Sequence, residues 1–122
     1  MNNQAKEIIT EYIFDAVTSA KDSNLDLDDL HNYIFNEDYF IIGYFEAEQM
    51  IGKLGFTSFS AIELVKDYEI DNFGEFNTEI NSEKICNMLA YILGEQVLSE
   101  LDLSGLDFND DYDEIIEQLE KL

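Results

Sequence analysis

The sequence predicts an all-α fold in which residues 1–122 form one compact domain of five or six helices. Apolar residues recur at spacings of three and four, as in amphipathic helices, along most of the chain. Asn, Ser and Thr precede several of these segments and Gly follows others, and these residue types commonly cap helices. No proline, linker or internal repeat marks a second domain, and 122 residues fit the usual size of one domain.

Three helices are predicted in the first half of the chain. The first covers residues 5–21, whose apolar side chains share one face, and residues 22–26 then favour a turn. A short helix follows over residues 30–36. The third runs over residues 39–55, because the apolar run 39–45, which alone could be a buried strand, continues at helical spacing.

A fourth helix is predicted in the middle of the chain. Thr57 and Ser58 are natural N-caps for it, and Gly74 is a good C-terminal stop. Residues 71–78, which are rich in Asn, Asp and Gly, favour a loop.

Two more helices complete the predicted fold. Asn81 or Ser82 caps the first of them, which reaches about Leu101 and has the most regular apolar face of all. Gly105 lies in a turn, and the last helix begins at Asp110. Its inward residues are expected to be Ile115, Ile116, Leu119 and Leu122, while its other positions are nearly all acidic.

Negative charge dominates the composition. The chain has 28 Asp and Glu against 6 Lys, one His and no Arg, which gives a formal net charge of -22. Codon bias toward A and T would favour Lys as well as Asn, Ile, Phe and Tyr, so it leaves the scarcity of cations unexplained. Adaptation to high salt usually lowers large apolar residues, yet 9 Phe are present. Since 46% of residues are hydrophobic, we expect a folded protein that carries its charge on the surface.

The sequence offers little for catalysis. Cys86 is the single cysteine, which excludes an internal disulfide and a cysteine-based zinc site, and we expect it to be a buried hydrophobe. His31 is the single histidine, which excludes a multi-histidine metal site, and we expect a partly exposed helical residue. None of the patterns GxGxxG, GxxxxGK[ST], GxSxG and HExxH occurs. We therefore predict a non-enzymatic protein with no catalytic residue and no cofactor.

A calcium site is the first function to test in an acidic protein. Asp22, Asn24, Asp26 and Asp28 alternate as they do in an EF-hand loop. Loop positions six and twelve require Gly and Glu, but Leu27 and Tyr33 occupy them. The sequence therefore predicts no designed metal site.

Membrane association is not expected. The first residues lack a basic region followed by an apolar stretch, and no apolar run approaches the roughly 18–20 residues that span a bilayer. Anionic lipid surfaces would also repel the chain. A lone cysteine fits a reducing cytoplasm.

Acidic residues crowd the C-terminal part of the chain. In a helix, acids three and four residues apart lie about 5–6 Å apart, and like charges at that spacing destabilise it. Duplex DNA carries about one charge per 1.7 Å of axis, so spaced carboxylates can resemble it, and a basic channel that binds DNA could be blocked. Solubility alone is the plainer explanation of the acids. The predicted partner-binding residues are Glu100, Asp102, Asp107, Asp110, Asp111, Asp113, Glu114, Glu117, Glu120, Asp26, Asp28 and Asp29.

Residues 30–43, 71–78 and 87–95 resemble a family of small, acidic, uncharacterised bacteriophage proteins. The resemblance implies a phage origin and a host-cytoplasm setting. In charge, size and helicity the chain is also similar to phage DNA-mimic anti-restriction proteins, with a local match over residues 28–31, although it ends in an amphipathic helix rather than a long acidic tail. This similarity implies an anti-restriction or anti-CRISPR inhibitor whose partner is a basic DNA- or RNA-binding host protein, without direct nucleic-acid binding. It also allows a homodimer.

An apolar interaction surface is the alternative prediction. It would make the chain a non-enzymatic structural or regulatory phage protein that assembles through helices, with acids serving solubility. The aromatic residues exceed the obvious needs of one small core. We expect them nonetheless to be mainly core residues. They are Tyr39, Phe40, Tyr44, Phe45, Phe73 and Phe76.

Overall fold

Helix α5 (Ser82–Leu98) lies at the centre of the molecule. It belongs to the C-terminal half of the chain. The computed structural model describes residues 1–36, 40 and 42–122. Within these ranges the chain forms six α-helices, one short 3-10 helix and no strand. The all-α prediction of a compact single domain is confirmed.

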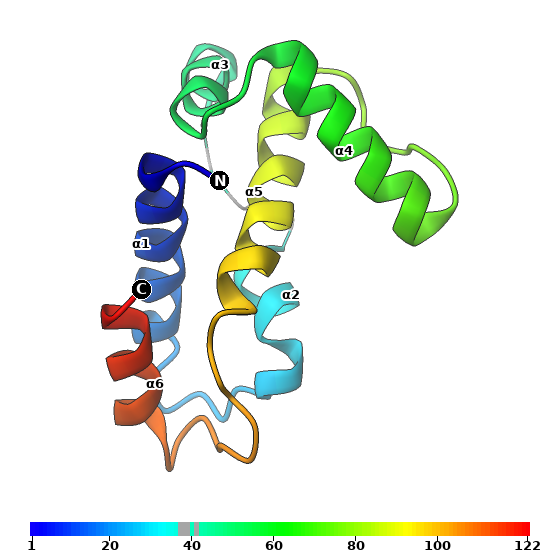
Figure 1. Cartoon of the computed structure of the whole chain (residues 1–122). Coiled ribbons are helices and arrows are strands. Elements are labelled where there is room, and N and C mark those ends of the chain that lie inside the picture. The colour runs from blue at the N-terminus through cyan, green and yellow to red at the C-terminus, as the bar shows by residue number, and fades with distance from the viewer. Residues whose placement is uncertain (37–39, 41) are drawn as a thin grey trace.

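The other helices pack against α5 or against one another (Figure 1). Helices α1, α2, α3 and α4 all pack against α5, while α6 packs against α1. The loops before α2 and α6 lie with α6 at one end of the molecule, and α3 lies at the other end with the start of α4 (Figure 1). The elements are α1 (Asn3–Ser19), η1 (Leu27–Asp29), α2 (Leu30–Ile34), α3 (Tyr44–Lys53), α4 (Ser58–Phe73), α5 (Ser82–Leu98) and α6 (Tyr112–Glu120).

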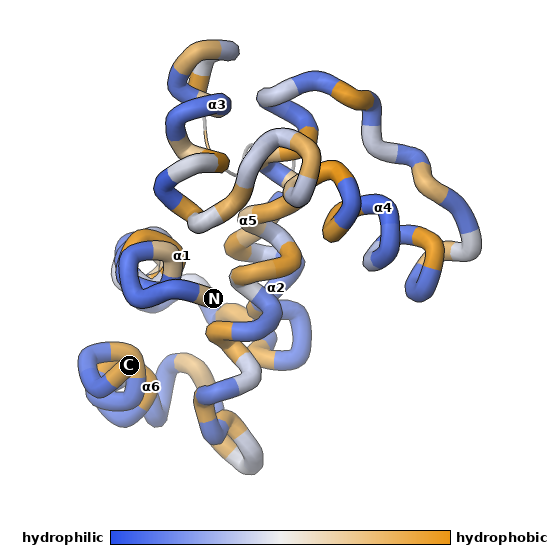
Figure 2. The backbone as a smooth tube through the Cα atoms, turned by 45° about the horizontal axis from the view of Figure 1, so that its top comes forward, coloured by the Kyte–Doolittle hydropathy of each residue, from blue (hydrophilic) through white to orange (hydrophobic). Residues whose placement is uncertain are grey.

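Helix α1 follows the predicted amphipathic pattern. Its N-cap is Asn2, whose Oδ1 accepts a hydrogen bond from the Ala5 amide at 2.7 Å. Every fourth residue from Ala5 to Val17 is fully buried, so one narrow stripe faces α5 while the acidic face stays in solvent. Figure 2 shows this division as hydrophobic and hydrophilic colouring around the tube of α1.

Helix α5 has a wider apolar surface than the others because it has neighbours on several sides. Asn81 caps it by accepting from the Lys84 amide at 2.9 Å, as predicted. Near its C-terminal end, Gly94 gives the ring of Phe35 room to lie against the helix backbone. The buried residues of α5 are Ile85, Cys86, Leu89, Ala90, Ile92, Leu93, Gly94 and Val97.

The predicted signals at both ends of α4 are confirmed. Thr57 and Ser60 form a capping box at its start. Gly74 ends it with a φ of 82°, in the left-handed region that favours glycine. The buried carboxylate of Glu69 then accepts a hydrogen bond from the Thr78 amide at 3.0 Å, which holds the following loop against the helix.

Helix boundaries differ from the prediction at several places. The helix expected from Tyr39 begins at Tyr44, because Gly43 has an extended backbone there and acts as the N-cap; residues 37–39 and 41 lie outside the described residues. Phe40 is tied to α5 instead, since its amide donates to Asn87 Oδ1 at 3.3 Å. Helix α4 continues to Phe73, α5 ends at Leu98, and α6 begins at Tyr112.

None of the helices described is long and apolar enough to cross a membrane.

Candidate acidic interaction surface

Two acidic segments that are far apart in the sequence meet at one end of the molecule. The side chain of Asn109 donates a hydrogen bond to Asn24 Oδ1, across 85 residues of chain. A pocket of about 730 Å³ lies between the two segments, and Asp26, Asp28 and Asp107 are among its lining residues. The fold therefore brings the predicted acids of residues 26–29 next to those that precede α6.

The acids predicted to bind a partner are nearly all at the surface. Eleven of the twelve are exposed, and Asp111 is half-buried. In α6 the apolar residues Ile115 and Leu119 are buried, so the acids of this helix lie on its outer side. Their role in binding stays a prediction.

Some of these carboxylates also hold the backbone that carries them. Asp107 Oδ2 accepts from the amides of Asn109 and Asp110, at 3.1 and 3.0 Å. Asp111 Oδ2 accepts from the Asp107 amide at 2.8 Å. Because these side chains replace backbone partners in the turns before α6, removing them would change loop structure as well as charge.

The loop after α5 is fastened to α6 by a glutamine. Gln118 Oε1 accepts from the Asp102 amide and Gln118 Nε2 donates to the Asp102 carbonyl oxygen, both at 2.8 Å. The Asp102 carboxylate is left outside this pair of bonds and accepts from the Ser104 amide at 3.3 Å. This two-bond tie sets the position of Asp102 relative to the acids of α6.

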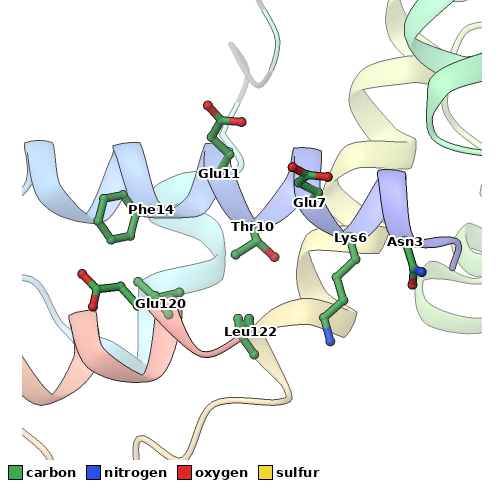
Figure 3. A pocket seen from close by; sticks show the side chains of 9 residues that line it. Asn3, Lys6, Glu7, Thr10, Glu11, Phe14, Glu120 and Leu122 are labelled. Carbon is green, nitrogen blue, oxygen red and sulfur yellow. The ribbon is translucent and has the colours of Figure 1, made fainter.

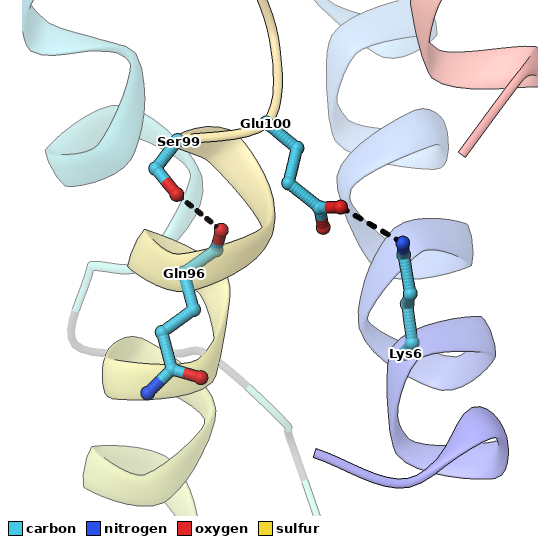
Figure 4. Close-up of polar contacts among 4 residues, drawn as sticks. All are labelled: Lys6, Gln96, Ser99 and Glu100. Carbon is cyan, nitrogen blue, oxygen red and sulfur yellow. Dashed lines mark hydrogen bonds and ion pairs between the residues drawn. The ribbon is translucent and has the colours of Figure 1, made fainter.

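Few cations offset this charge. In the described part of the chain, ion pairs reach two of the twelve acids: Lys6 contacts Glu100 and Lys121 contacts Glu117, each at 3.0 Å. The first pair links α1 to the end of α5 (Figure 4). Both pairs are solvent-exposed and therefore weak. Lys21 lies over the ring of Tyr112 instead, 5.3 Å from its centroid.

Across the part of the chain that the structure describes, these acids are not grouped with other residues into a metal site. Among the residues described, no group of three or more His, Cys, Asp and Glu side chains could hold a metal ion. Cys86 is buried, and burial raises the pKa of its thiol to about 12, so it would not be a thiolate at neutral pH. His31 is half-buried on α2, where its Nε2 donates to the Tyr91 carbonyl oxygen at 2.8 Å. This hydrogen bond links α2 to α5, so His31 helps to hold the two helices together.

A second pocket, of about 630 Å³, lies between α1 and α6 (Figure 3). Thr10, Phe14 and Leu122 line it, and the buried Thr10 Oγ1 has no hydrogen-bond partner in the part of the chain described. Glu7 and Glu11 point away from α6, and the amine of Lys6 is held by Glu100 (Figures 3 and 4). Six of the nine residues that line the pocket are polar or charged, and Phe14, Leu119 and Leu122 are the apolar ones.

Several aromatic residues expected in the core are on the surface instead. The expectation was wrong for Tyr44, Phe45 and Phe73, which are 51%, 75% and 55% exposed. Phe40 and Phe76 do pack against the core, and Tyr39 lies outside the described residues.

Two of the exposed rings, those of Phe45 and Phe59, have the same geometric cause. Phe45 precedes the buried Ala47 by two positions, and Phe59 precedes the buried Ala61 by two. Residues two apart lie on nearly opposite sides of a helix, at about 100° per residue, so both rings face solvent. Sequence reasoning did not single out Phe59, since the spacing identifies it only once Ala61 is known to be buried.

Comparisons with known proteins leave the question of family open. No family model, no curated protein and no solved structure matches the chain. The resemblance to phage proteins therefore stays a prediction.

Proposed function

We propose that this protein is a phage-encoded inhibitor that binds a basic, nucleic-acid-handling defence protein of its host, of the restriction or CRISPR type, in the host cytoplasm. It competes with DNA or RNA for the basic channel of that protein. The observation that supports this proposal is the meeting of two distant acidic segments with α6 at one end of the fold. The acidic surface is defined as the twelve predicted partner-binding residues.

Occlusion by charge would explain why so many carboxylates stay without cations. A basic channel attracts a concentrated negative surface, which speeds association. The attraction reaches only about 8 Å at physiological ionic strength, so binding should weaken as salt rises. The loop carboxylates of Asp107 and Asp111 are held by amide groups, so part of the charge array is already in position before binding.

A capture experiment from host lysate tests the proposal. The tagged protein is immobilised at about 100 mM salt, bound proteins are eluted with a salt gradient, and duplex DNA is added as competitor. We expect one stoichiometric nucleic-acid-binding protein that duplex DNA displaces. Recovery of many basic proteins, all lost at moderate salt, would contradict the proposal.

A charge-matched pair of variants gives the control. Both variants remove four exposed carboxylates and keep side-chain size, so that net charge is the same and only the position differs. The first should lose the partner while the second retains it; equal losses would mean that net charge alone attracts the partner. The first variant carries Asp113→Asn, Glu114→Gln, Glu117→Gln and Glu120→Gln in α6, and the second Glu63→Gln, Asp67→Asn, Asp71→Asn and Glu75→Gln in and after α4.

A second candidate function is assembly through an apolar helical surface, as a structural or regulatory protein. The exposed rings of Phe45 and Phe59 favour it, because large apolar side chains gathered at a surface commonly mark an interface. Neutralising α6 separates the two functions: inhibition by charge is lost, whereas assembly survives or improves.

A further inference from the structure

A small pocket is lined by residues of α3, α4 and α5 and of the loop before α5. Helix α3 and the start of α4 lie at the opposite end of the molecule from α6 (Figure 1). The volume of the pocket is about 280 Å³. Tyr44 from α3 and Ile62 from α4 line it, together with Ile80 from the loop before α5 and Ile85 from α5 itself. It belongs neither to the acidic surface nor to the pocket between α1 and α6.

Bulky apolar side chains stand exposed around this pocket. Ile80 is 65% exposed and Tyr44 half exposed, although both line it. The ring of Phe45 lies edge-on to that of Tyr44, with 5.7 Å between centroids. Phe59 lies in α4 directly after Ser58 and one turn before Ile62, both of which line the pocket. An open apolar pocket beside exposed rings is the arrangement that receives an anchor side chain of a partner.

Carboxylates outnumber amines at the rim of the pocket, where Lys84 is the single cation within residues 79–85. Glu48 lines it and accepts a hydrogen bond from the Ser82 hydroxyl at 3.4 Å. Glu79 and Glu83 are exposed and flank the lining residues 80–82 in the sequence. None of these three carboxylates is in an ion pair within the ranges that the structure describes.

We propose that this pocket docks a bulky apolar side chain carried on a cationic segment of a partner protein. The apolar floor provides burial for the anchor, and basic residues beside it on the partner would meet the carboxylates of the rim. The volume is below the roughly 300–1,000 Å³ of sites for small molecules and suits a single side chain. The inference is independent of the acidic surface, since the two involve different residues.

A second copy of the chain fits this pocket less well than a cationic partner. In a twofold dimer each patch contacts its own counterpart, so Glu48, Glu79 and Glu83 would face acids of the same kind. The net charge of -22 adds further repulsion between copies. Charge complementarity therefore favours a foreign, basic occupant.

The probe for the test is a labelled amphipathic helical peptide made of Lys and Leu. A Lys and Ala peptide of equal length and charge is the control for attraction by charge alone. Binding is measured by fluorescence anisotropy at about 150 mM salt, and amide chemical shifts map the contact. We expect the Leu peptide to bind at least about tenfold more tightly than the Ala peptide and to shift the amides of Tyr44, Ile80 and Ile85.

Surface variants locate the binding. A double variant, Tyr44→Ser with Ile80→Ser, should weaken binding of the Leu peptide about tenfold. Ile70→Ser, which removes an exposed apolar side chain of α4 outside the pocket, should change it less than about twofold. Circular dichroism checks that each variant is folded, and the α6 variant with four neutralised acids should retain the preference for Leu over Ala.

Four results would overturn the inference. Equal binding of the two peptides would show that charge alone attracts them. Equal losses in the double variant and in Ile70→Ser would place the contact elsewhere. Self-association in light scattering that Ile80→Ser abolishes would make a second copy the occupant. Loss of binding by the α6 variant alone would instead assign the contact to the acidic surface.

Discussion

The ring of Phe35, the residue that follows α2, lies directly against the backbone of Gly94 in α5. A Cβ atom at position 94 would overlap the Cε2 and Cζ atoms of the ring. Phe35 is almost fully buried, so the ring has little space into which it could move. Glycine is needed at this position for its lack of a side chain, because the ring of Phe35 occupies the space that a Cβ atom would take.

Replacing Gly94 with Ala should destabilise the protein, although alanine is the better helix former. Overpacking of a core costs about 1–3 kcal/mol, and the change from Gly to Ala gains about 1 kcal/mol in helix propensity. The cost therefore exceeds the gain over most of this range and roughly equals it at the low end. We expect a lower midpoint of unfolding in urea. The matched control is Gly52→Ala in α3, where nothing lies within 4 Å of the added Cβ and stability should rise. A rise in both variants would show that Phe35 adjusts freely.

The buried carboxylate of Glu69 should support the loop that follows α4. Glu69→Ala removes the acceptor of the Thr78 amide and should cost about 1–3 kcal/mol. Glu69→Gln keeps an acceptor oxygen and should cost less. Urea unfolding gives the free energies, and hydrogen exchange of the Thr78 amide should be faster in the Ala variant. Unchanged exchange at Thr78 would mean that the loop is held by other contacts.

Tyr68 should make the protein less stable at alkaline pH. Burial, and then the Glu95 carboxylate that accepts from its hydroxyl at 2.7 Å, raise the pKa of Tyr68 above its ordinary value of 10.0. The folded state therefore keeps the proton at a pH where the unfolded state loses it. This contribution to stability is complete below about pH 10 and is lost as the pH rises toward the folded-state pKa.

The measurement for Tyr68 is the urea midpoint at about pH 8 and about pH 11. Between these two pH values, the urea midpoint of Tyr68→Phe should fall less than that of the unmodified protein. Tyr33→Phe, at an exposed tyrosine, controls for the loss of a phenol and should leave the fall unchanged. An identical fall in both variants would count against the role assigned to Tyr68.

Acids at the two ends of α6 should contribute to stability with opposite sign. Asp113 lies in the first turn, where a negative charge interacts favourably with the helix dipole, and Glu120 is the last helical residue, where the interaction is unfavourable. Each substitution removes one repulsive charge, so the difference in stability between the two variants reports the interaction with the helix dipole. Glu120→Gln should therefore be more stable than Asp113→Asn, by about 0.6–2 kcal/mol at low salt. Thermal melts at low and high salt provide the test, and a difference that persists unchanged in high salt would rule out this electrostatic cause.

Local signals were enough to predict most of the helices. The four-residue apolar stripe of α1, the Thr57 cap and the Gly74 stop are all confirmed, since each depends on neighbours in the sequence. The predicted start of α3 was wrong, because the apolar spacing continues across Gly43 although the helix begins only after it. The amide of Phe40 instead donates a hydrogen bond to Asn87 of α5. That hydrogen bond joins residues 47 positions apart, and helical spacing carries no information about it.

The sequence by itself determined the fold class, the surface position of the acids and the scarcity of cations, because periodicity and charge are properties of the chain. Only the tertiary structure decided which acids are neighbours: the bond between Asn24 and Asn109 brings two segments together across 85 residues. It also decided that Phe45 and Phe59 are exposed, since that depends on which side of each helix meets α5. Such juxtapositions follow from packing between distant helices, which no local pattern specifies.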